Sequence, residues 1–450
     1  MAERRGGRRV NRTRGAGLAA AVVAVAALLL NGYRTSGRSS SCAAPSSPPA
    51  TLSGNDRRDP VVASDDGGGI VAMWESLTGG PVEAAVHTPT GPWSTAAPLS
   101  APFARFPSVA VNPTGAAVAA WQIPESVQTT AVQVATRDAT GAWSPPFDVS
   151  PARRHAREPQ IALTGNGTAL LVWRRDTTGD DTVLEVTERP PDGQWTTPQT
   201  LSDPSVRSKR PRLAVAPNGA AALVWEQTVD GRLTVVAATR AGDGRWSAPL
   251  TLSGTTEAHE PDVAIGPTGT ATAVWIDETE NGVAVMAASH SGDGTWSPPV
   301  AIGRGSALPH ETPRPGRADT GADVAVLRDG RIAAAWTMVD SGTNRAQTAT
   351  TQPDGAWGAA TALSKPGAAA SGVQVTALAG GGAAAGWEEL DGGLIRARVA
   401  RLAPDGSAPL CMAVTTAVAD SGAVRLVGGS APTAVFVDFN RSRVQAAQIP

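Results

Sequence analysis

Short apolar runs separated by polar turns repeat along most of the chain. The clearest copy spans residues 261–303, and near copies begin at Pro107, Pro159 and Pro211. Each apolar run in the clearest copy is five to seven residues long, a length typical of β-strands and short for helices. The pattern therefore predicts an all-β protein built from one repeated unit.

Each unit is predicted to contain four strands, A to D, in two hairpins. The first hairpin joins strand A (residues 262–266) to strand B (270–276) through Pro-Thr-Gly, in which Gly269 supplies the positive φ of a tight turn. The second joins strand C (283–289) to strand D (296–301) through Gly-Asp-Gly, a sequence typical of hairpin turns. Strand B is apolar on both faces of its pleat, so we expect neighbouring sheets to cover both faces.

Tryptophan marks the period of the repeat. All 13 Trp residues fall at two positions, in strand B or at the start of strand D. Spacings in the strand B series run from 47 to 61 residues, and its members are Trp74, Trp121, Trp173, Trp225, Trp275, Trp336 and Trp387, followed by Phe436. A period of about 50 residues with four strands per unit is typical of propeller blades. We therefore interpret the Trp residues as scaffold.

The sequence predicts a single β-propeller over residues 51–450. It has eight four-stranded blades if the unit of Phe436 is complete, and seven if it is not. That last unit stops after a strand C, whereas Thr51 to Gly54 repeats the strand D ending Thr251 to Gly254. We therefore expect an N-terminal strand near Thr51 to Ser53 to complete the last blade and close the ring.

Residues 1–50 are predicted to be an export signal or membrane anchor followed by a Ser/Pro-rich spacer. The first 14 residues are rich in Arg and residues 16–30 are apolar, which is the order of regions in an export signal. As a helix the apolar run spans about 22 Å, less than the roughly 30 Å of a bilayer core, unless residues 31–33 extend it. We expect an extracellular or cell-envelope protein, either cleaved or anchored through residues 16–33.

Cysteine usage leaves three alternatives open. The only two Cys residues are Cys42 and Cys411, and an exported protein can form disulfides. Cys42 is therefore lipidated, bridged to Cys411 or free.

The net charge of the chain indicates which classes of partner to expect. Residues 1–41 carry a net charge of +7, so the rest of the chain carries −9. An acidic domain is a poor candidate for binding nucleic acid, and we expect a monomer with a glycan or protein ligand and no cofactor. No metal site is expected, because His155, His259 and His310 meet only if their loops converge.

Functional residues are expected where the repeats differ. In a propeller the D-to-A and B-to-C connections emerge on one face, and here that face varies while the other repeats Pro-x-Gly and Asp-Gly turns. The variable face also carries an insertion, residues 304–318, which we expect over the axial mouth. Charged residues follow the strand B Trp on this face, and the candidates for ligand binding among them are Arg174, Glu226, Asp277 and Glu388.

A cation precedes strand A in five consecutive units. It lies two residues before the Pro that opens the strand, at Arg58, Arg105, Arg157, Lys209 and His259. We predict that these five residues, the cationic arc, ring part of the axial mouth and bind an anionic ligand, since guanidinium binds carboxylate, sulfate or phosphate bidentately. The alternative is that each cation pairs with a neighbouring acid, such as Asp59, Glu158 or Glu260, and only fixes the loop.

Two motifs resemble those of the sialidase-like superfamily. Its R-I-P motif is similar to Arg58-Asp59-Pro60, and its Asp-box is similar to Ser291-Gly-Asp-Gly-Thr-Trp296, which is one residue shorter. The resemblance implies a β-propeller but not the enzyme. Sialidases use a Tyr nucleophile beside a Glu, and the only Tyr here is Tyr33, within the leader.

These observations predict an exported, envelope-tethered propeller that binds an acidic glycan or a protein on its variable face without catalysis. One alternative is a carbohydrate-active enzyme, a glycosidase or lyase, with a site unlike that of sialidases. Another is a structural scaffold. A deep axial pocket with a buried carboxylate of shifted pKa would favour the enzyme, whereas a shallow charged rim would favour binding.

Overall fold

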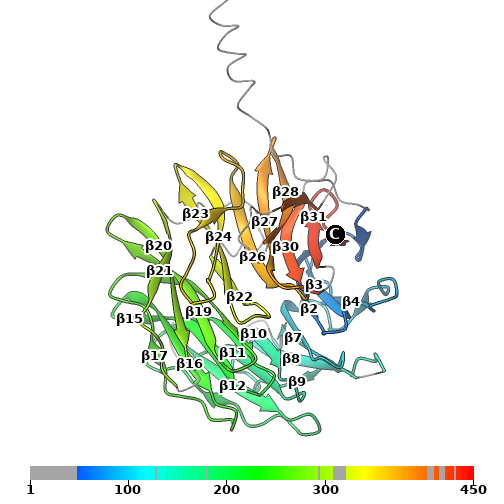
Figure 1. The fold of residues 1–450 in the computed structure, drawn as a ribbon. Helices are drawn as coiled ribbons and strands as arrows, with labels where there is room; N and C mark the ends of the chain where they lie inside the picture. The colour runs from blue at the N-terminus through cyan, green and yellow to red at the C-terminus, as the bar shows by residue number, and fades with distance from the viewer. Residues whose placement is uncertain are drawn as a thin grey trace, which may run out of the picture. The chain divides into compact units, whose positions relative to one another are not determined.

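The computed structural model describes residues 48–126, 129–138, 140–177, 181–291, 294–307, 321–402, 410–414, 421–429 and 432–449. These residues form eight four-stranded antiparallel sheets, whose first strands contact one another in a closed ring. The red blade of β30 and β31 lies beside the blue blade of β2 and β3 (Figure 1). The predicted eight-bladed propeller is confirmed, and the seven-bladed alternative is wrong.

Each blade runs from an inner strand A to an outer strand D. Blades 1 to 8 are numbered by their inner strands, which are β2 (Arg57–Ser64), β6 (Arg105–Val111), β10 (Ala156–Leu163), β14 (Ser208–Val215), β18 (Ala258–Ile265), β22 (Ala322–Val326), β26 (Ala370–Ala377) and β30 (Ser421–Val427). The B strands are β3 (Ile70–Ser76), β7 (Ala117–Pro124), β11 (Ala169–Asp176), β15 (Ala221–Val229), β19 (Ala271–Thr279), β23 (Ile332–Asp340), β27 (Ala383–Asp391) and β31 (Thr433–Asp438).

The outer half of each blade contains a long strand and a short one. The C strands are β4 (Glu83–His87), β8 (Thr130–Arg137), β12 (Thr182–Arg189), β16 (Arg232–Arg240), β20 (Gly282–His290), β24 (Thr343–Thr350), β28 (Leu394–Leu402) and β32 (Arg443–Gln448). The D strands are β5 (Ala97–Pro98), β9 (Phe147–Asp148), β13 (Gln199–Thr200), β17 (Leu250–Thr251), β21 (Val300–Gly305), β25 (Thr361–Ala362), β29 (Leu410–Ala413) and β1 (Ala50–Thr51).

In the clearest copy, strands A and D differ most from their expected boundaries. Trp296 precedes β21 and forms only a single bridge with His290, and pairing with β20 resumes at Val300. β18 begins at Ala258, earlier than the expected Asp262, because a β-bulge lets strand A continue past the Pro. Gly269 has the predicted positive φ, +90°.

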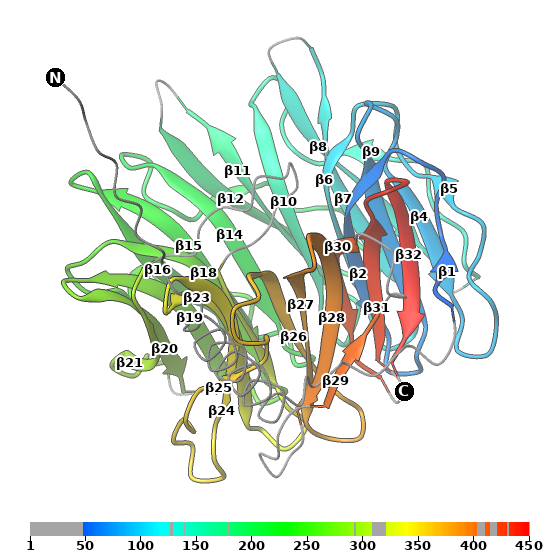
Figure 2. The same cartoon turned by 90° about the horizontal axis from the view of Figure 1, so that it is seen from above.

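The N-terminal strand closes the ring in the predicted way. Ala50 and Thr51 of β1 pair with Ala446 and Gln445 of β32, and Figure 2 shows blue β1 beside red β32. The pairing continues beyond β1, because Leu52 N donates to the Val444 carbonyl at 2.9 Å. The C-terminal blade is therefore completed from the other end of the chain.

The core lies between the blades, around the B strands. All seven residues of β3 are buried, as expected for a strand that is covered on both faces. The seven strand B Trp side chains and Phe436 are fully buried; Trp225, for example, packs on Val172 and Leu184 of the preceding blade. The scaffold interpretation is confirmed for this series, whereas the strand D Trp residues are only partly buried.

Several predictions concern residues outside the described ranges. These are the leader, the state of Cys42, the position of His310, and the part of the insertion from residue 308 onward. Within the described ranges, no helix has the length and apolar character needed to cross a membrane.

Candidate functional site: an axial pocket lined by the inner strands

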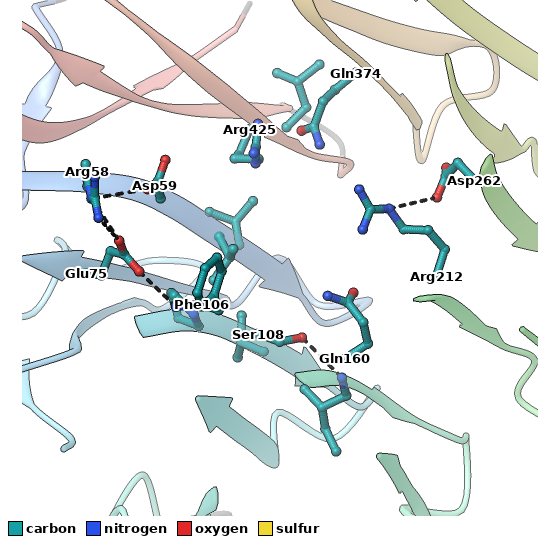
Figure 3. Close-up of a pocket in the computed structure, with 16 residues that line it drawn as sticks. Arg58, Asp59, Glu75, Phe106, Ser108, Gln160, Arg212, Asp262, Gln374 and Arg425 are labelled. Atoms are coloured by element: carbon teal, nitrogen blue, oxygen red, sulfur yellow. Dashed lines mark hydrogen bonds and ion pairs between the residues drawn. The ribbon is translucent and has the colours of Figure 1, made fainter. Parts of the chain in front are cut away.

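A cavity of about 540 Å³ lies where the inner strands meet. Seven of the eight inner strands contribute to its wall, and Figure 3 shows their side chains converging on one space. A second cavity of about 130 Å³ shares Arg212, Asp262 and Gln374 with the first. The convergence of seven blades on one polar space makes this the candidate site.

The same position lines the first cavity in seven of the eight inner strands, and in blade 6 it lines the second cavity. Each of these residues pairs with the residue directly before the strand B Trp or Phe, as Val61 pairs with Met73 and Arg425 with Val435. We call this set the axial ring; in blade order it is Val61, Ser108, Gln160, Arg212, Asp262, Asp323, Gln374 and Arg425.

A β-bulge separates the cationic arc from the axial ring. In blade 1 the register shifts between Arg58 and Val61, and six other inner strands shift at the same place. The residue before the Pro has a positive φ, for example 47° at Asp59 and 54° at Phe106, which is uncommon outside Gly. The R-x-P motif is thus the sequence of a bulge that re-aims the strand.

Three ring side chains connect their blade to the next one. Ser108 Oγ accepts a hydrogen bond from Ile161 N at 3.1 Å. Asp262 Oδ2 accepts from Val324 N at 3.2 Å and Asp323 Oδ2 from Val375 N at 2.8 Å. These ring residues therefore satisfy backbone N–H groups of the next inner strand as well as lining the pocket.

Asp262 and Asp323 form a carboxyl pair. Burial raises the pKa of Asp262. A hydrogen bond from Asp323, the charge of Arg212 and nearby backbone N–H groups each lower this pKa, but by less. Burial raises the pKa of Asp323 well above its usual value, and both the negative charge of Asp262 and the hydrogen bond to it add to the effect. The pair therefore retains a shared proton at pH values where an exposed aspartate is ionised.

Replacing Asp323 by Asn should make stability less dependent on pH. A carboxyl whose pKa is raised by folding stabilises the fold at low pH, and this contribution is lost as pH rises through the folded pKa. An Asn side chain preserves a donor to Asp262 and an acceptor for Val375 N without ionising. Each unit by which folding raises the pKa is worth about 1.4 kcal/mol.

The measurement is urea unfolding of wild type and Asp323→Asn across neutral and alkaline pH. The variant should gain stability over wild type as pH rises. Asp243→Asn, at an exposed turn, serves as the control and should not show this gain. Parallel pH profiles for wild type and Asp323→Asn would contradict the shared proton.

The rim of the pocket is built around Glu75. Arg58 Nε donates to Glu75 Oε1 at 2.8 Å, and Phe106 N donates to Glu75 Oε2 at 2.8 Å. Burial raises the pKa of Glu75 and the Asp59 charge adds to this, while the Phe106 N–H, Arg58 and Arg105 oppose it. Among the site residues predicted from the sequence, Arg58 is the one that lines the cavity.

Every member of the cationic arc contacts a carboxylate. Arg58 lies 3.4 Å from Asp59, which is one of the pairs expected if the cations only fix the loops. Arg105 lies 3.9 Å from Glu75. The other three distances are 3.0 Å for Arg157 to Asp176, 3.2 Å for Lys209 to Glu226 and 3.0 Å for His259 to Glu278. Arg157 and His259 thus pair with acids of strand B in addition to being next to Glu158 and Glu260. Ligand binding by the arc stays a prediction.

The remaining predicted site residues also have partners within the protein. Arg174 lies 3.4 Å from Glu158. Asp277 accepts a hydrogen bond from Trp275 Nε1, and burial raises the pKa of Asp277 to about 6. Glu226 and Glu388 repeat the arrangement of Glu75, in which the carboxylate accepts a backbone N–H from the bulge of the next blade. Glu226 accepts from Glu260 N, and Glu388 accepts from Ala423 N.

No group of three or more metal-binding side chains occurs among the residues that the structure describes. Of the His residues considered for a metal, His155 contacts Arg157 at 3.2 Å and His259 contacts Glu278.

The axial ring was not among the site residues predicted from the sequence. A signal for it exists. In blades 2 to 5 the residue directly after the strand A Pro is polar and differs between copies, at Ser108, Gln160, Arg212 and Asp262, although the three residues that follow it are apolar. The bulge interrupts the alternation of inward and outward side chains along strand A. Alternation alone therefore does not predict that these side chains point toward the axis.

Comparison with known proteins supports the fold. No protein-family model matches the sequence, and no curated protein sequence matches it. Among solved structures, the BP39L lectin from Burkholderia pseudomallei has a TM-score of 0.54 at 14% identity, over 80% of this chain and 99% of the lectin. A PL25 ulvan lyase has a TM-score of 0.48 at 11% identity, over 82% and 95% of the two chains. A Hadza microbial sialidase, Hz136, has a TM-score of 0.40 at 13% identity, over 72% of each chain. At 14% identity, the likeness to the lectin shows a shared fold and nothing further.

Proposed function

We propose that this protein is an exported, envelope-tethered β-propeller that binds a glycan in its axial pocket without transforming it. The observation that carries the proposal is the convergence of polar side chains from seven of the eight blades on one cavity of about 540 Å³. Pockets of about 300 to 1,000 Å³ with a few convergent polar groups are typical of small-ligand sites. The cellular location rests on the leader sequence, residues 1–30.

A glycan fits this pocket better than a protein does. The pocket is concave and is lined by both donors and acceptors, including Ser108, Gln160 and Gln374, which match the hydroxyl groups of sugars. A protein partner would instead be expected on a broad rim such as the cationic arc. The fold likeness to BP39L, a lectin by name, is a further reason to test sugars first.

Binding without catalysis is favoured by the partners of the pocket acids. Asp262, Asp323 and Glu75 each accept a backbone N–H from the neighbouring blade. Asp262 and Asp323 also hydrogen-bond each other, whereas glycosidase carboxyls are separated by about 5 Å or more to act across a glycosidic bond.

A carbohydrate-active enzyme is the second candidate. Its supporting observation is that carboxyls with raised pKa values line the cavities at the axis, Glu75 and Asp262 in the first cavity and Asp323 in the second. Such groups are candidates for general acid catalysis. The release of shorter or unsaturated products from a bound glycan would favour this function over binding alone.

The test is a glycan-array screen of the purified protein, followed by a variant that fills the pocket. Val61→Phe places an aromatic ring in the cavity and should abolish binding of any array ligand. Val300→Phe makes the same change on an exposed outer strand and should leave binding intact. Mass spectrometry after prolonged incubation reports any cleavage. Binding that survives Val61→Phe, with the melting temperature unchanged, would place the site elsewhere.

A further inference from the structure

The described ranges contain three Asn-Gly pairs, and each lies at a turn between two strands. Asn166-Gly167 and Asn218-Gly219 lie in the A-to-B turns of blades 3 and 4, and Asn281-Gly282 lies in the B-to-C turn of blade 5. All three Asn residues are exposed. An Asn-Gly pair is chemically labile, because Gly has no Cβ to keep its backbone nitrogen away from the neighbouring carboxamide. What differs between the three pairs is the local structure that holds each one.

Hydrogen bonds hold the pair in blade 4. Asn218 Oδ1 accepts from Ala220 N at 3.0 Å, which fixes the carboxamide in the turn. The following nitrogen is held as well, because Gly219 N donates to the Ala216 carbonyl at 3.0 Å. Both bonds must break before Gly219 N reaches the Asn218 side chain.

The pair in blade 3 is held in the same way. Asn166 Oδ1 accepts from Thr168 N at 3.1 Å and also from Thr164 Oγ1. Gly167 N donates to the Thr164 carbonyl at 3.0 Å. The A-to-B turns therefore protect both of their Asn-Gly pairs.

The carboxamide of Asn281 lacks such a restraint. Within the part of the chain that the structure describes, no group forms a hydrogen bond with this side chain. Glu280 and Asn281 are the exposed two-residue tip of the β19–β20 hairpin, and Thr279 pairs with Gly282 directly below it. Loop tips open locally at little cost in free energy. Only this end pair of the ladder must open for the carboxamide to meet Gly282 N.

Packing explains why a glycine follows Asn281. The B-to-C turns of blades 4 and 6 place their glycine within the two-residue tip, at Gly231 and Gly342. In blade 5 the glycine comes after the tip, at Gly282, where an added Cβ would lie 2.3 Å from the Gly305 carbonyl oxygen. Position 282 therefore requires glycine, and this requirement creates the labile pair.

We propose that Asn281 is a deamidation site of this protein. Gly282 N gives up its proton to a base and attacks Asn281 Cγ, so that a C–N bond forms and closes a five-membered succinimide ring. The Cγ–Nδ2 bond breaks, and the nitrogen leaves as ammonia after it takes up a proton. Water then opens the ring at one of its two carbonyls and yields aspartate or isoaspartate. No oxidant or cofactor takes part.

The products change the variable face of blade 5. Either product adds a negative charge next to Glu280 and three residues from Glu278, which contacts His259 of the cationic arc at 3.0 Å. Isoaspartate also adds one carbon to the main chain at the tip, which disturbs the pairing of Thr279 with Gly282. An aged protein therefore carries a more acidic rim near His259 than a newly made one.

The test is incubation of the folded full chain in mildly alkaline buffer, followed by peptide mapping with mass spectrometry. Conversion of amide to acid should be roughly tenfold faster at Asn281 than at Asn166 and Asn218, because local opening there is less costly. Labelling by isoaspartyl methyltransferase should identify the isoaspartate product. In urea, where the turns are lost, all three pairs should react at similar rates.

Asn281→Gln is the matched variant, because the longer side chain would have to close a less favourable six-membered ring. It should remove the rapid conversion and the methyltransferase label while leaving the melting temperature unchanged, since residue 281 is exposed. Gly282→Ala is unsuitable because of the contact with Gly305.

Two results would overturn the inference. One is equal rates at the three pairs in the folded protein. The other is an unreacted Asn281 in the folded protein under conditions in which the chain in urea reacts at all three pairs. Neither result bears on glycan binding, which the array screen and Val61→Phe test separately.

Discussion

Replacing Trp225 by Ala is expected to lower the free energy of unfolding by about 3 to 5 kcal/mol. The indole is 0% exposed and packs on Val172 and Leu184 of the preceding blade. Truncation removes this contact between blades and leaves a cavity that the surrounding strands cannot fill. The Nε1 hydrogen bond to Gln227 at 3.1 Å is lost as well.

Urea unfolding of wild type and variant measures this effect. Trp246→Ala is the matched control, because Trp246 belongs to the strand D series and is only partly buried, so its loss should cost clearly less. Glycan binding should follow the folded fraction, since a fully buried indole does not reach a ligand. A Trp225→Ala protein with wild-type stability and no ligand binding would contradict the scaffold assignment.

Deleting residues 51–54 should destabilise the propeller by several kcal/mol. The deletion removes Leu52, which is buried against Trp74 and Val435, and loss of a core Leu alone costs about 2 to 5 kcal/mol. It also removes Ser53 Oγ, which accepts from Val444 N at 2.8 Å. The outer edge of β32 then becomes an unpaired strand edge.

Deleting residues 1–45 is the control, because β1 begins only at Ala50. Melting temperatures of the two truncations, measured by circular dichroism, should differ clearly, with only the loss of residues 51–54 lowering the value. Light scattering should also detect association of the protein through the exposed edge. Equal melting temperatures would show that ring closure does not depend on this strand.

The architecture could be predicted because its determinants are local and repeat along the chain. A period of about 50 residues, two hairpin turns per unit and a Trp in each strand B require only short-range sequence patterns. The closing strand was also predictable, since Thr51 to Gly54 copies the end of a strand D. The predicted strand, Thr51 to Ser53, begins one residue later than β1 and ends two residues later.

The candidate site could be predicted only in part. The cations of the arc are evident in the sequence, and so are the acids that follow the strand B Trp. Their pairing was not evident for Arg157 and His259, whose partners Asp176 and Glu278 lie on the neighbouring strand. Distance between side chains on adjacent strands depends on register, which the bulge changes.

The sequence by itself determined the fold, because hydrophobic alternation and turn residues specify strands and their number without reference to distant parts of the chain. Only the tertiary structure decided which polar residues meet. Arg212 and Arg425 are far apart in the chain, and they share one cavity because eight blades close into a ring. In seven of the eight inner strands a bulge, with positive φ at residues such as Phe106, lies directly before the axial-ring residue and sets its direction. Side-chain patterns do not encode this consequence of backbone geometry.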